Sequence, residues 1–435
     1  MIFGGTNMSY NLTKRYLAKA MVGLAASLLL STSALTIAAH AEGSVEVMHF
    51  WTTGGEAAAL KAVKDKVEAG GVKWVDAPVA GGGGDAAKAA LQARISGGNP
   101  PAAMLMLGQN IIDWAKAGML ADLGEVAKAG DWENALPDAV KQFAKVDEKW
   151  VSAPTNIHRV NMVWASKAAF DKIGAQPPKT WEEFNALAPI FEKAGIIPLA
   201  HGGQAWQDLT LFDSVALGIG GPDFYRKAFV EQDEATLKSD EMKAVFDEMR
   251  LLRGMVDKDF SGRDWNLATA MVIEGKAAMQ IMGDWSKGEF TNAKKQADVD
   301  FLCFPAPGTS GNFTFLINSF SMFEQPTPES KQSQAVLANA IMDKSVQNKF
   351  NIAKGSIPAV IGTPEDGFDS CAKKNVADLA EASKANTALP TVAYTHAANA
   401  AVTGAITDVV TKHFNSDMSS ADAVEALAKA VAAVK

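Results

Sequence analysis

Apolar and polar residues alternate in several short segments of the chain up to about residue 165, and longer segments with helical spacing separate them. A period of two is typical of strands, and an apolar residue every three or four positions is typical of helices. The pattern predicts strands over 44–50, 72–79, 102–107, 150–154 and 159–164, and helices over 57–67, 86–96 and 111–117. Strands that alternate with helices indicate an α/β lobe with a mainly parallel sheet.

The balance shifts toward helices after about Pro177. Thr180 is suited to cap a helix, because Glu182 and Glu183 follow in its first turn. The pattern predicts helices over 180–194, 225–230, 239–255, 267–274 and 421–434, and strands over 277–282, 300–304 and 313–323. No low-complexity linker separates the two parts. We therefore expect an α/β fold of two lobes, joined by several short crossings around a hinged interlobe cleft.

The beginning of the chain has the features of an export signal over residues 1–41. Lys14, Arg15 and Lys19 form a basic region, an apolar run follows, and Ala39-His40-Ala41 offers small residues where a signal peptidase reads. A membrane anchor is the alternative, but Ser and Thr residues weaken the apolar run. No cysteine follows the run to carry a lipid. We expect cleavage after Ala41 and a soluble periplasmic protein.

The remaining 394 of the 435 residues are enough for two lobes. Three of the 41 basic residues lie in the signal, so 38 Lys and Arg face 49 Asp and Glu, a net charge of −11. This charge disfavours nucleic acid or an anionic membrane as a partner. In an exported protein, Cys303 and Cys371 predict a disulfide, with two buried free thiols as the alternative.

Motifs of the common enzyme classes do not occur in the sequence. The run Gly81–Gly84 precedes Asp85-Ala86-Ala87 instead of the Lys-Ser or Lys-Thr of a phosphate loop, which favours a loop near the cleft. The histidines form no HExxH or HxH pair for zinc, and no GxSxG nucleophile turn occurs. The sequence thus predicts a binding protein with no catalytic residue, no cofactor and no metal site.

Polar and aromatic residues gather in predicted turns far apart in the chain. These turns contain His49–Glu56, Gly283-Asp284-Trp285, Lys354–Pro358 and Tyr394-Thr395-His396. Ligands of open α/β sheets bind at strand ends, so the turns are expected to form two walls of one pocket. Ten Trp against four Tyr fit this expectation, because the C–H face of a sugar packs well on an indole ring. A Trp-rich core still accounts for most of the ten.

Several segments resemble a known family in the same order over nearly the whole chain after the signal. They are VEVMHFWTTGGE (45–56), VAGGGGDAA (79–87), PTNIHRVN (154–161), LAHGGQAWQD (199–208), DWNLATAMVIEGKAAMQIMGDWSKGEF (264–290), KGSIP (354–358) and GFDSCA (367–372). The chain resembles the periplasmic glucose- and monosaccharide-binding proteins of ABC importers, within the carbohydrate-specific extracellular solute-binding family. This resemblance implies a two-lobed periplasmic binding protein fold with three crossovers and a sugar held between the lobes.

The resemblance also implies which residues hold the sugar. Trp51, with Phe50 beside it, and Trp285 would sandwich the ring, next to Asp284 in the same turn. Three groups would bind hydroxyls: Glu56, Lys354 and His396. Cys303 and Cys371 stand where such relatives carry a disulfide.

Three positions depart from the glucose-binding pattern, namely Phe50 in place of a tryptophan, Leu107 in place of a lysine and Asn318 in place of an aspartate. Loss of a charged hydrogen bond from that lysine would cost about 1.5–3 kcal/mol. One hypothesis is that Phe50 and Leu107 make the pocket roomier and less polar, which suits a different, deoxy or substituted sugar. The alternative is that Gln109 or a water replaces the lysine and glucose remains the ligand.

We therefore predict a receptor that delivers a glucose-like monosaccharide to an ABC permease. A chemoreceptor is a further partner compatible with this function. The lobes are expected over 43–157 with 315–349, and over 158–312 with 352–435. A ligand of the oligosaccharide or polyol class is the alternative, which Trp206 or Trp265 in the cleft would favour. A glycan-active enzyme is the distant alternative, because it needs two facing carboxyls and only Glu56 is a candidate.

Overall fold

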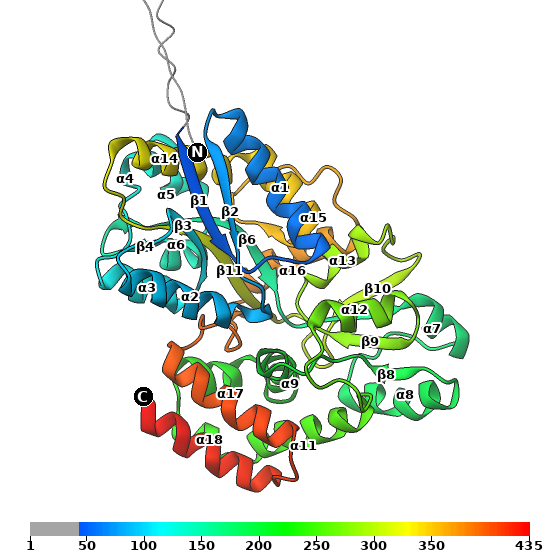
Figure 1. Cartoon of the computed structure of the whole chain (residues 1–435). Coiled ribbons are helices and arrows are strands. Elements are labelled where there is room, and N and C mark those ends of the chain that lie inside the picture. The colour runs from blue at the N-terminus through cyan, green and yellow to red at the C-terminus, as the bar shows by residue number, and fades with distance from the viewer. Residues whose placement is uncertain (1–42) are drawn as a thin grey trace, which may run out of the picture. The chain divides into compact units, whose positions relative to one another are not determined.

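The larger of the two principal sheets has seven strands in the order β12-β6-β11-β3-β1-β2, with β13 also on β11. The computed structural model describes residues 43–435, and the predicted export signal lies outside them. The strands are β1 (Ser44–His49), β2 (Lys73–Pro78), β3 (Ala103–Leu107), β6 (Ser152–Arg159), β11 (Phe313–Met322), β12 (Ile357–Pro358) and β13 (Ala388–Pro390). This sheet and the helices on it are the first lobe (Figure 1).

The first-lobe sheet is mixed, so the expectation of a mainly parallel sheet is wrong for this lobe. β1 pairs in parallel with β2 and β3. β11 returns from the second half of the chain and lies antiparallel between β3 and β6. A strand that re-enters the sheet from the opposite direction leaves no pattern of its own in the local sequence.

Helices cover both faces of this sheet (Figure 1). Successive side chains of β1 therefore pack into hydrophobic cores on opposite faces. Val45 and Val47 pack into one core, while Met48 belongs to another core on the opposite face together with Met104 and Met106. The elements of this part are α1 (Gly54–Ala69), the 3₁₀ turn η1 (Gly82–Gly84), α2 (Asp85–Ser96), α3 (Gln109–Lys116), α4 (Gly124–Ala129), α5 (Trp132–Ala135), α6 (Asp138–Ala144), β4 (Lys145–Val146), β5 (Lys149–Trp150), α14 (Pro328–Met342), α15 (Lys344–Lys354) and α16 (Ser370–Lys384).

The second lobe has a four-stranded sheet in the order β10-β7-β9-β8. Its strands are β7 (Met162–Ser166), β8 (Ile197–Leu199), β9 (Ala277–Ile281) and β10 (Phe301–Pro305). Its helices are α7 (Lys167–Ile173), α8 (Trp181–Lys193), α9 (Ala205–Tyr225) with the π-helical turn η2 (Arg226–Val230), α10 (Glu234–Leu237), α11 (Asp240–Met255), α12 (Trp265–Ile273), α13 (Ser286–Asn292), α17 (Ala400–Phe414) and α18 (Ser420–Val434). None of the helices between residues 43 and 435 is both long and apolar enough to cross a bilayer.

Strand pairing moves one predicted lobe boundary. Residues 352–435 were expected in the second lobe, but β12 pairs with β6 and β13 pairs with β11. Residues 357–390 therefore complete the first-lobe sheet, and the last passage to the second lobe lies between β13 and α17. The short strands escaped prediction because two or three residues are too few to show a period.

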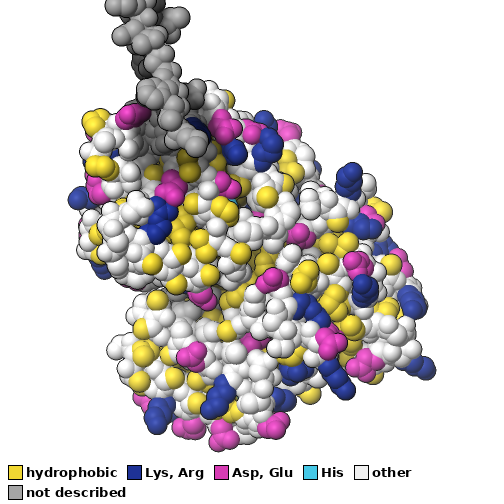
Figure 2. All heavy atoms as spheres, in the orientation of Figure 1, with side chains coloured by type: hydrophobic (Ala, Val, Ile, Leu, Met, Phe, Trp, Pro, Cys, Tyr) yellow, Lys and Arg dark blue, Asp and Glu magenta, His cyan; other side chains and the backbone are white. Residues whose placement is uncertain are grey.

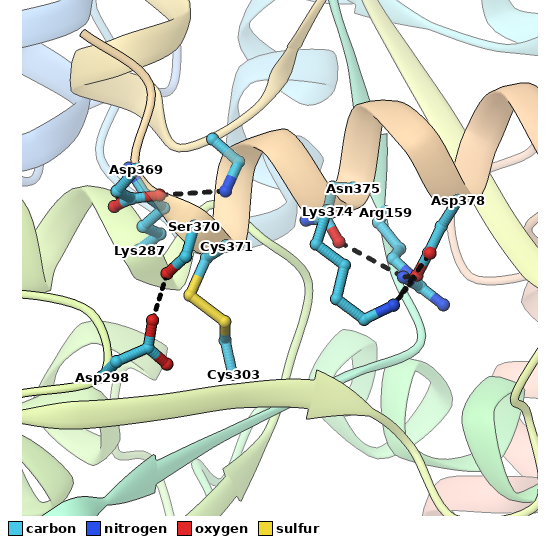
Figure 3. Close-up of a disulfide and its surroundings, with 11 residues drawn as sticks. Arg159, Lys287, Asp298, Cys303, Asp369, Ser370, Cys371, Lys374, Asn375 and Asp378 are labelled. Carbon is cyan, nitrogen blue, oxygen red and sulfur yellow. Dashed lines mark hydrogen bonds and ion pairs between the residues drawn. A yellow bond between two sulfur atoms is a disulfide. The ribbon is translucent and has the colours of Figure 1, made fainter.

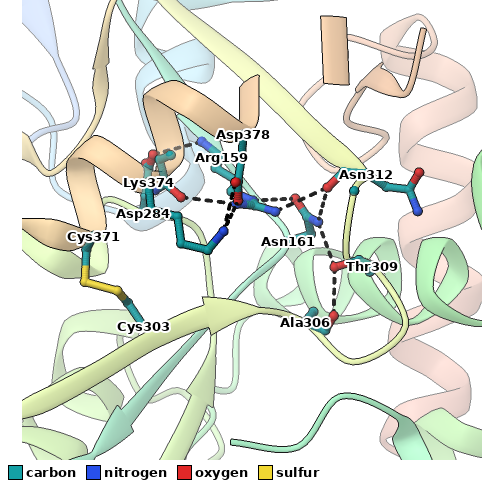
Figure 4. Close-up of polar contacts among 12 residues, drawn as sticks. Arg159, Asn161, Asp284, Cys303, Ala306, Thr309, Asn312, Cys371, Lys374 and Asp378 are labelled. Carbon is teal, nitrogen blue, oxygen red and sulfur yellow. Dashed lines mark hydrogen bonds and ion pairs between the residues drawn. A yellow bond between two sulfur atoms is a disulfide. The ribbon is translucent and has the colours of Figure 1, made fainter. Parts of the chain in front are cut away.

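A polar network around Arg159 ties the passages between the lobes together (Figure 4). Arg159, at the end of β6, is 1% exposed and donates to Asp378 on α16 at 2.6 Å and to the carbonyl of Asn312 at 3.3 Å. Asn161, just beyond β6, donates to the same carbonyl and to Thr309. A buried guanidinium with several acceptors holds these segments in one arrangement.

The predicted disulfide is confirmed. Cys303 on β10 and Cys371 on α16 are joined, with their Cα atoms 6.1 Å apart (Figure 3). Asp369, which caps the start of the same helix, pairs with Lys287 of α13 at 3.1 Å. The disulfide thus connects a strand of the second lobe to a helix packed against the first-lobe sheet.

Candidate functional site

A cavity of about 180 Å³, the main chamber, lies between the lobes where β1 and β3 end. The first lobe lines it with Phe50, Trp51, Thr52, Thr53, Glu56, Ala80, Gly81, Gly82, Gly83, Leu107, His158, Leu316, Asn318 and Lys354. The second lobe and the last passage between lobes line it with Trp206, Asp264, Trp265, Asn266, Trp285 and Tyr394. Ligand pockets in proteins of this class of architecture commonly combine aromatic walls with a few polar groups, as this one does.

Trp51 is fixed on the first-lobe side of the main chamber. It follows β1 and is 3% exposed. Its ring lies 5.7 Å from Phe320 and 5.4 Å from Phe350, between ring centroids, and the Lys354 Nζ lies 5.1 Å from its centroid. The aromatic contacts and the cation hold the indole in one orientation before any ligand arrives.

Trp285 faces the chamber from the second lobe within an aromatic cluster. Its centroid lies 5.7 Å from Tyr394 and 6.5 Å from Trp206, and the Trp206 and Tyr394 rings are 6.0 Å apart. Gly283 is needed beneath this ring, because a Cβ there would stand 2.1 Å from the indole. Trp51 and Trp285 therefore line one chamber from opposite lobes.

Glu56 and Lys354 form a buried ion pair at the first-lobe wall. Lys354 Nζ donates to Glu56 Oε1 at 3.0 Å. The other carboxylate oxygen accepts from the backbone amides of Thr52 and Thr53 at 3.0 and 3.2 Å, and it completes a capping box at the start of α1. The two charges are thereby compensated within the wall, and they present a polar surface to the chamber.

His158 offers a hydrogen-bond acceptor to the chamber. Its Nδ1 contacts the carboxylate of Asp284, which also accepts from the backbone amide of Arg159 at 2.9 Å. Burial lowers the pKa of His158 although Asp284 opposes that effect, so the ring is neutral. With the proton on Nδ1 toward the carboxylate, Nε2 has an unshared pair, and no hydrogen bond to Nε2 forms within residues 43–435.

Two amides supply further polar groups. Asn318 on β11 is 3% exposed, and Asn266 lies in the first turn of α12. Neither side chain has a hydrogen-bond partner in the described part of the chain, while both line the main chamber. An amide carries two donors and one acceptor oxygen, which suits the alternating donor and acceptor character of adjacent hydroxyls.

Seven of the ten predicted ligand-binding residues line the main chamber: Phe50, Trp51, Glu56, Leu107, Trp285, Asn318 and Lys354. The other three do not. Gln109 starts α3 and donates to Asp113, and Asp284 lies behind His158 and holds it. His396 accepts from the backbone amide of Ile317 at 3.0 Å, its other nitrogen contacts the carbonyl of Tyr394, and burial lowers its pKa to about 4.

Sequence patterns missed several lining residues, including His158, Asp264 and Asn266, whereas Tyr394 belongs to a turn that was expected in a pocket wall and it lines the chamber. Trp206 and Trp265 both line the chamber, and these are the residues that would favour a longer ligand. The glycine run 81–84 packs against Trp206. A Cβ at Gly82 or Gly83 would stand 3.0 or 2.8 Å from Trp206, so only glycine allows this approach between lobes.

The fold and the chamber define a two-lobed α/β binding protein whose ligand is enclosed by both lobes. The chain belongs to the bacterial extracellular solute-binding protein family, whose pattern matches residues 51–322.

Sequence relatives cover almost the whole chain. One is 50% identical over 92% of this chain and 96% of its own length, and is a probable sugar-binding periplasmic protein of Rhizobium meliloti (strain 1021). Another, of the same description in Brucella suis biovar 1 (strain 1330), is 49% identical over 97% of this chain and all of its own length.

Solved structures share the fold at low sequence identity. The bacterial solute receptor AcbH, described as having an exclusive preference for β-D-galactopyranose, superposes with a TM-score of 0.76, 18% identity and coverage of 90% of this chain and 99% of its own. A chitin oligosaccharide binding protein superposes with a TM-score of 0.74, 20% identity and coverage of 90% and 98%. These likenesses establish the two-lobed fold of solute receptors.

Proposed function

We propose that this chain is a periplasmic receptor that captures a sugar between its lobes and delivers it to the permease of an ABC importer. The sugar-binding descriptions of relatives with about half their residues in common support this proposal. A ligand that contacts both lobes favours the closed arrangement, and a permease then distinguishes the loaded receptor from the empty one. The same closed form would serve a chemoreceptor.

The observation that carries the proposal is the placement of Trp51 and Trp285 on opposite lobes of one chamber with neutral polar groups around them. Flat apolar rings cover the C–H faces of a pyranose, while His158, Asn266 and Asn318 reach its hydroxyls. The buried charges of Glu56 and Lys354 compensate each other, and the third charged residue in the lining, Asp264, is exposed and accepts from Gln204. The chamber therefore has no unpaired buried charge that would require an ionic ligand.

The ligand we propose is a glucose-like monosaccharide. The chamber volume of about 180 Å³ is below the range of roughly 300–1,000 Å³ that is typical of pockets for larger ligands. A single sugar ring is therefore the unit that the main chamber fits best.

A thermal-shift panel tests this function on the purified chain without its export signal, with pentoses, hexoses, disaccharides, polyols and, as a matched control, amino acids. A ligand at 100 times its dissociation constant stabilises by about 2.7 kcal/mol, a shift of a few degrees. Stabilisation by a hexose such as glucose or galactose is expected. Stabilisation by amino acids alone, or by nothing in the panel, would contradict a sugar receptor.

An oligosaccharide is the second candidate ligand, and two observations favour it. Trp206 and Trp265 line the main chamber. A second hollow of about 300 Å³, the α17 hollow, shares Trp206 and Tyr394 with the chamber and continues between Asp85 of α2 and Asp408 of α17. Figure 2 shows apolar side chains where the surface is hollowed between the lobes on this side. A disaccharide that stabilises the chain more than its component monosaccharides would favour this candidate.

A further inference from the structure

Leu107 is the point at which three cavities meet. It lines the main chamber, the α17 hollow and a third cavity of about 240 Å³ between α2 and α3, here called the α2 hollow. Leu107 ends β3, so its side chain stands at the edge of the first-lobe sheet that faces the ligand. Phe50 at the end of β1 lines the main chamber and the α2 hollow. The two side chains therefore separate these two cavities.

The α2 hollow has an apolar interior. Met104 and Met106 of β3, 2% and 4% exposed, line the hollow from the sheet. Leu91 lines it from α2. Trp114 of α3 lines the hollow as well, and its ring centroid lies 6.3 Å from that of Phe323. Methionine side chains are unbranched and flexible, so they adapt to an inserted apolar group at low cost.

Three of the four polar side chains that line the α2 hollow have partners, and the fourth, Gln92, is exposed to solvent. Asn110 donates to Thr395, Asp113 accepts from Gln109, and Lys88 pairs with Asp85 at 3.3 Å. The buried part of the hollow, in contrast, is formed by Leu91, Met104 and Met106 and offers apolar contact. The α17 hollow differs, because Asp408 and the threonines of α17 line it.

Leu107 and Phe50 themselves offer the main chamber no side-chain hydrogen-bond donor or acceptor, and the amide nearest to them is that of Asn318, which pairs with Leu107 across the strands. A sugar hydroxyl directed at them would lose its bonds to water and gain none. An apolar group in the same place loses nothing and buries surface. Phe50 is half-buried beneath the loop at Gly84, where a Cβ would stand 2.9 Å from its ring, so its position depends on that loop.

We propose that the sugar carried by this chain bears an apolar substituent, a methyl, alkyl or aryl group, which passes Leu107 and Phe50 into the α2 hollow. The proposal rests on the proposed function, because it assumes a sugar ring in the main chamber. It assigns Leu107 the role of a specificity-determining residue. Each methylene buried in the hollow is expected to tighten binding about fourfold, from roughly 0.8 kcal/mol per methylene.

Calorimetric titration of the chain without its export signal tests the proposal. The probes are D-glucose and D-galactose, their 6-deoxy forms, their methyl, butyl and phenyl glycosides, and one disaccharide of each. At least one substituted sugar is expected to bind more than tenfold tighter than its parent, with affinity rising from methyl to butyl. Parents that bind as tightly as every substituted form would overturn the proposal. So would a disaccharide that binds tightest, since that result points to the α17 hollow.

A pair of variants locates the effect. Met106→Gln places an amide of similar length in the α2 hollow, and it should abolish the preference for the substituted sugar while the parent binds within threefold of the unchanged chain. Trp114→Gln makes the same test from α3 if Met106→Gln fails to fold. The preference persisting in a folded variant would overturn the assignment. Failure of every sugar to bind would instead contradict the proposed function itself.

Discussion

Lys354 and Glu56 are 298 positions apart in the chain, yet their side chains form an ion pair of 3.0 Å in the wall of the main chamber. The side chains are 3% and 10% exposed. Removal of one member of a buried pair leaves the other charge uncompensated, which typically costs 3–5 kcal/mol of stability. We expect Lys354→Met to lower the free energy of unfolding, measured in urea, by about 3 kcal/mol.

A surface pair serves as the matched control. Lys61 and Asp65 pair across one turn of α1, and both side chains are more than half exposed. Lys61→Met should therefore change stability by at most about 1 kcal/mol. Equal losses in the two variants would show that the Lys354 pair is not effectively buried.

Contact between the glycine run and Trp206 predicts a difference between two glycine substitutions. Gly83 and Gly98 both have positive φ, +76° and +69°, so an alanine strains the backbone at either site. A Cβ at Gly83 would stand 2.8 Å from Trp206, whereas a Cβ at Gly98 would have no other atom within 4 Å. Gly83→Ala is expected to weaken sugar binding at least tenfold, and Gly98→Ala to leave the dissociation constant unchanged. Calorimetric titration decides, and equal affinities would mean that the loop does not close on Trp206.

Trp285→Ala is expected to weaken sugar binding by about 30-fold or more, since loss of a central aromatic contact commonly costs at least 2 kcal/mol. Trp74, 5% exposed on β2, provides the control, because it packs in the first-lobe core and does not line the main chamber. Trp74→Ala should lower the unfolding midpoint and retain the affinity. The same affinity in Trp285→Ala as in the unchanged chain would remove this residue from the site.

Stability below neutral pH should depend on His413 of α17. This ring is 1% exposed beside Phe246, and burial lowers its pKa to about 4 from an ordinary 6.5. The unfolded chain then binds a proton that the folded chain does not, so the stabilising contribution is present above pH 6.5 and is lost as the pH falls toward 4. His413→Leu, of similar volume, should flatten this part of the profile of unfolding free energy against pH.

Other buried groups also titrate below neutral pH, so the His413→Leu profile must be compared with that of the unchanged chain. Burial raises the pKa of Asp213 to about 6 and of Glu248 to about 7, so their protonation favours the folded state as the pH falls. The difference between His413→Leu and the unchanged chain isolates the histidine. Parallel profiles over pH 4–7 would contradict the prediction.

Sequence patterns predicted elements well where one face is buried and the other is solvated. The strand expected over 44–50 is β1 (Ser44–His49), and Thr180 caps α8 through the amide of Glu183. The long helix α9 (Ala205–Tyr225) was missed, and the helix expected over 225–230 is the π-helical turn η2 (Arg226–Val230) that follows it. The α9 residues Gln207–Leu217 are all buried, so no polar face marks a period.

The site residues were likewise predicted in part. Trp51, Trp285 and Lys354 were predicted through resemblance and line the main chamber. His396 was predicted in the same way, but backbone groups of Ile317 and Tyr394 already occupy both of its nitrogens. Such pairings depend on loops brought together from distant parts of the chain. Spacing along the sequence contains no information about them.

The place of β11 in the first-lobe sheet has a consequence for the order in which the chain acquires structure. β11 lies between β3 and β6, so a growing polypeptide that ends before residue 313 has both of those strand edges unpaired. The β3 and β6 edges cannot be joined until the part of the second lobe from β7 to β10 has been synthesised, and such long-range pairing is intrinsically slow. A nascent chain of this topology remains unstructured for longer than one built from local contacts, and in that state it can still be threaded through a narrow channel.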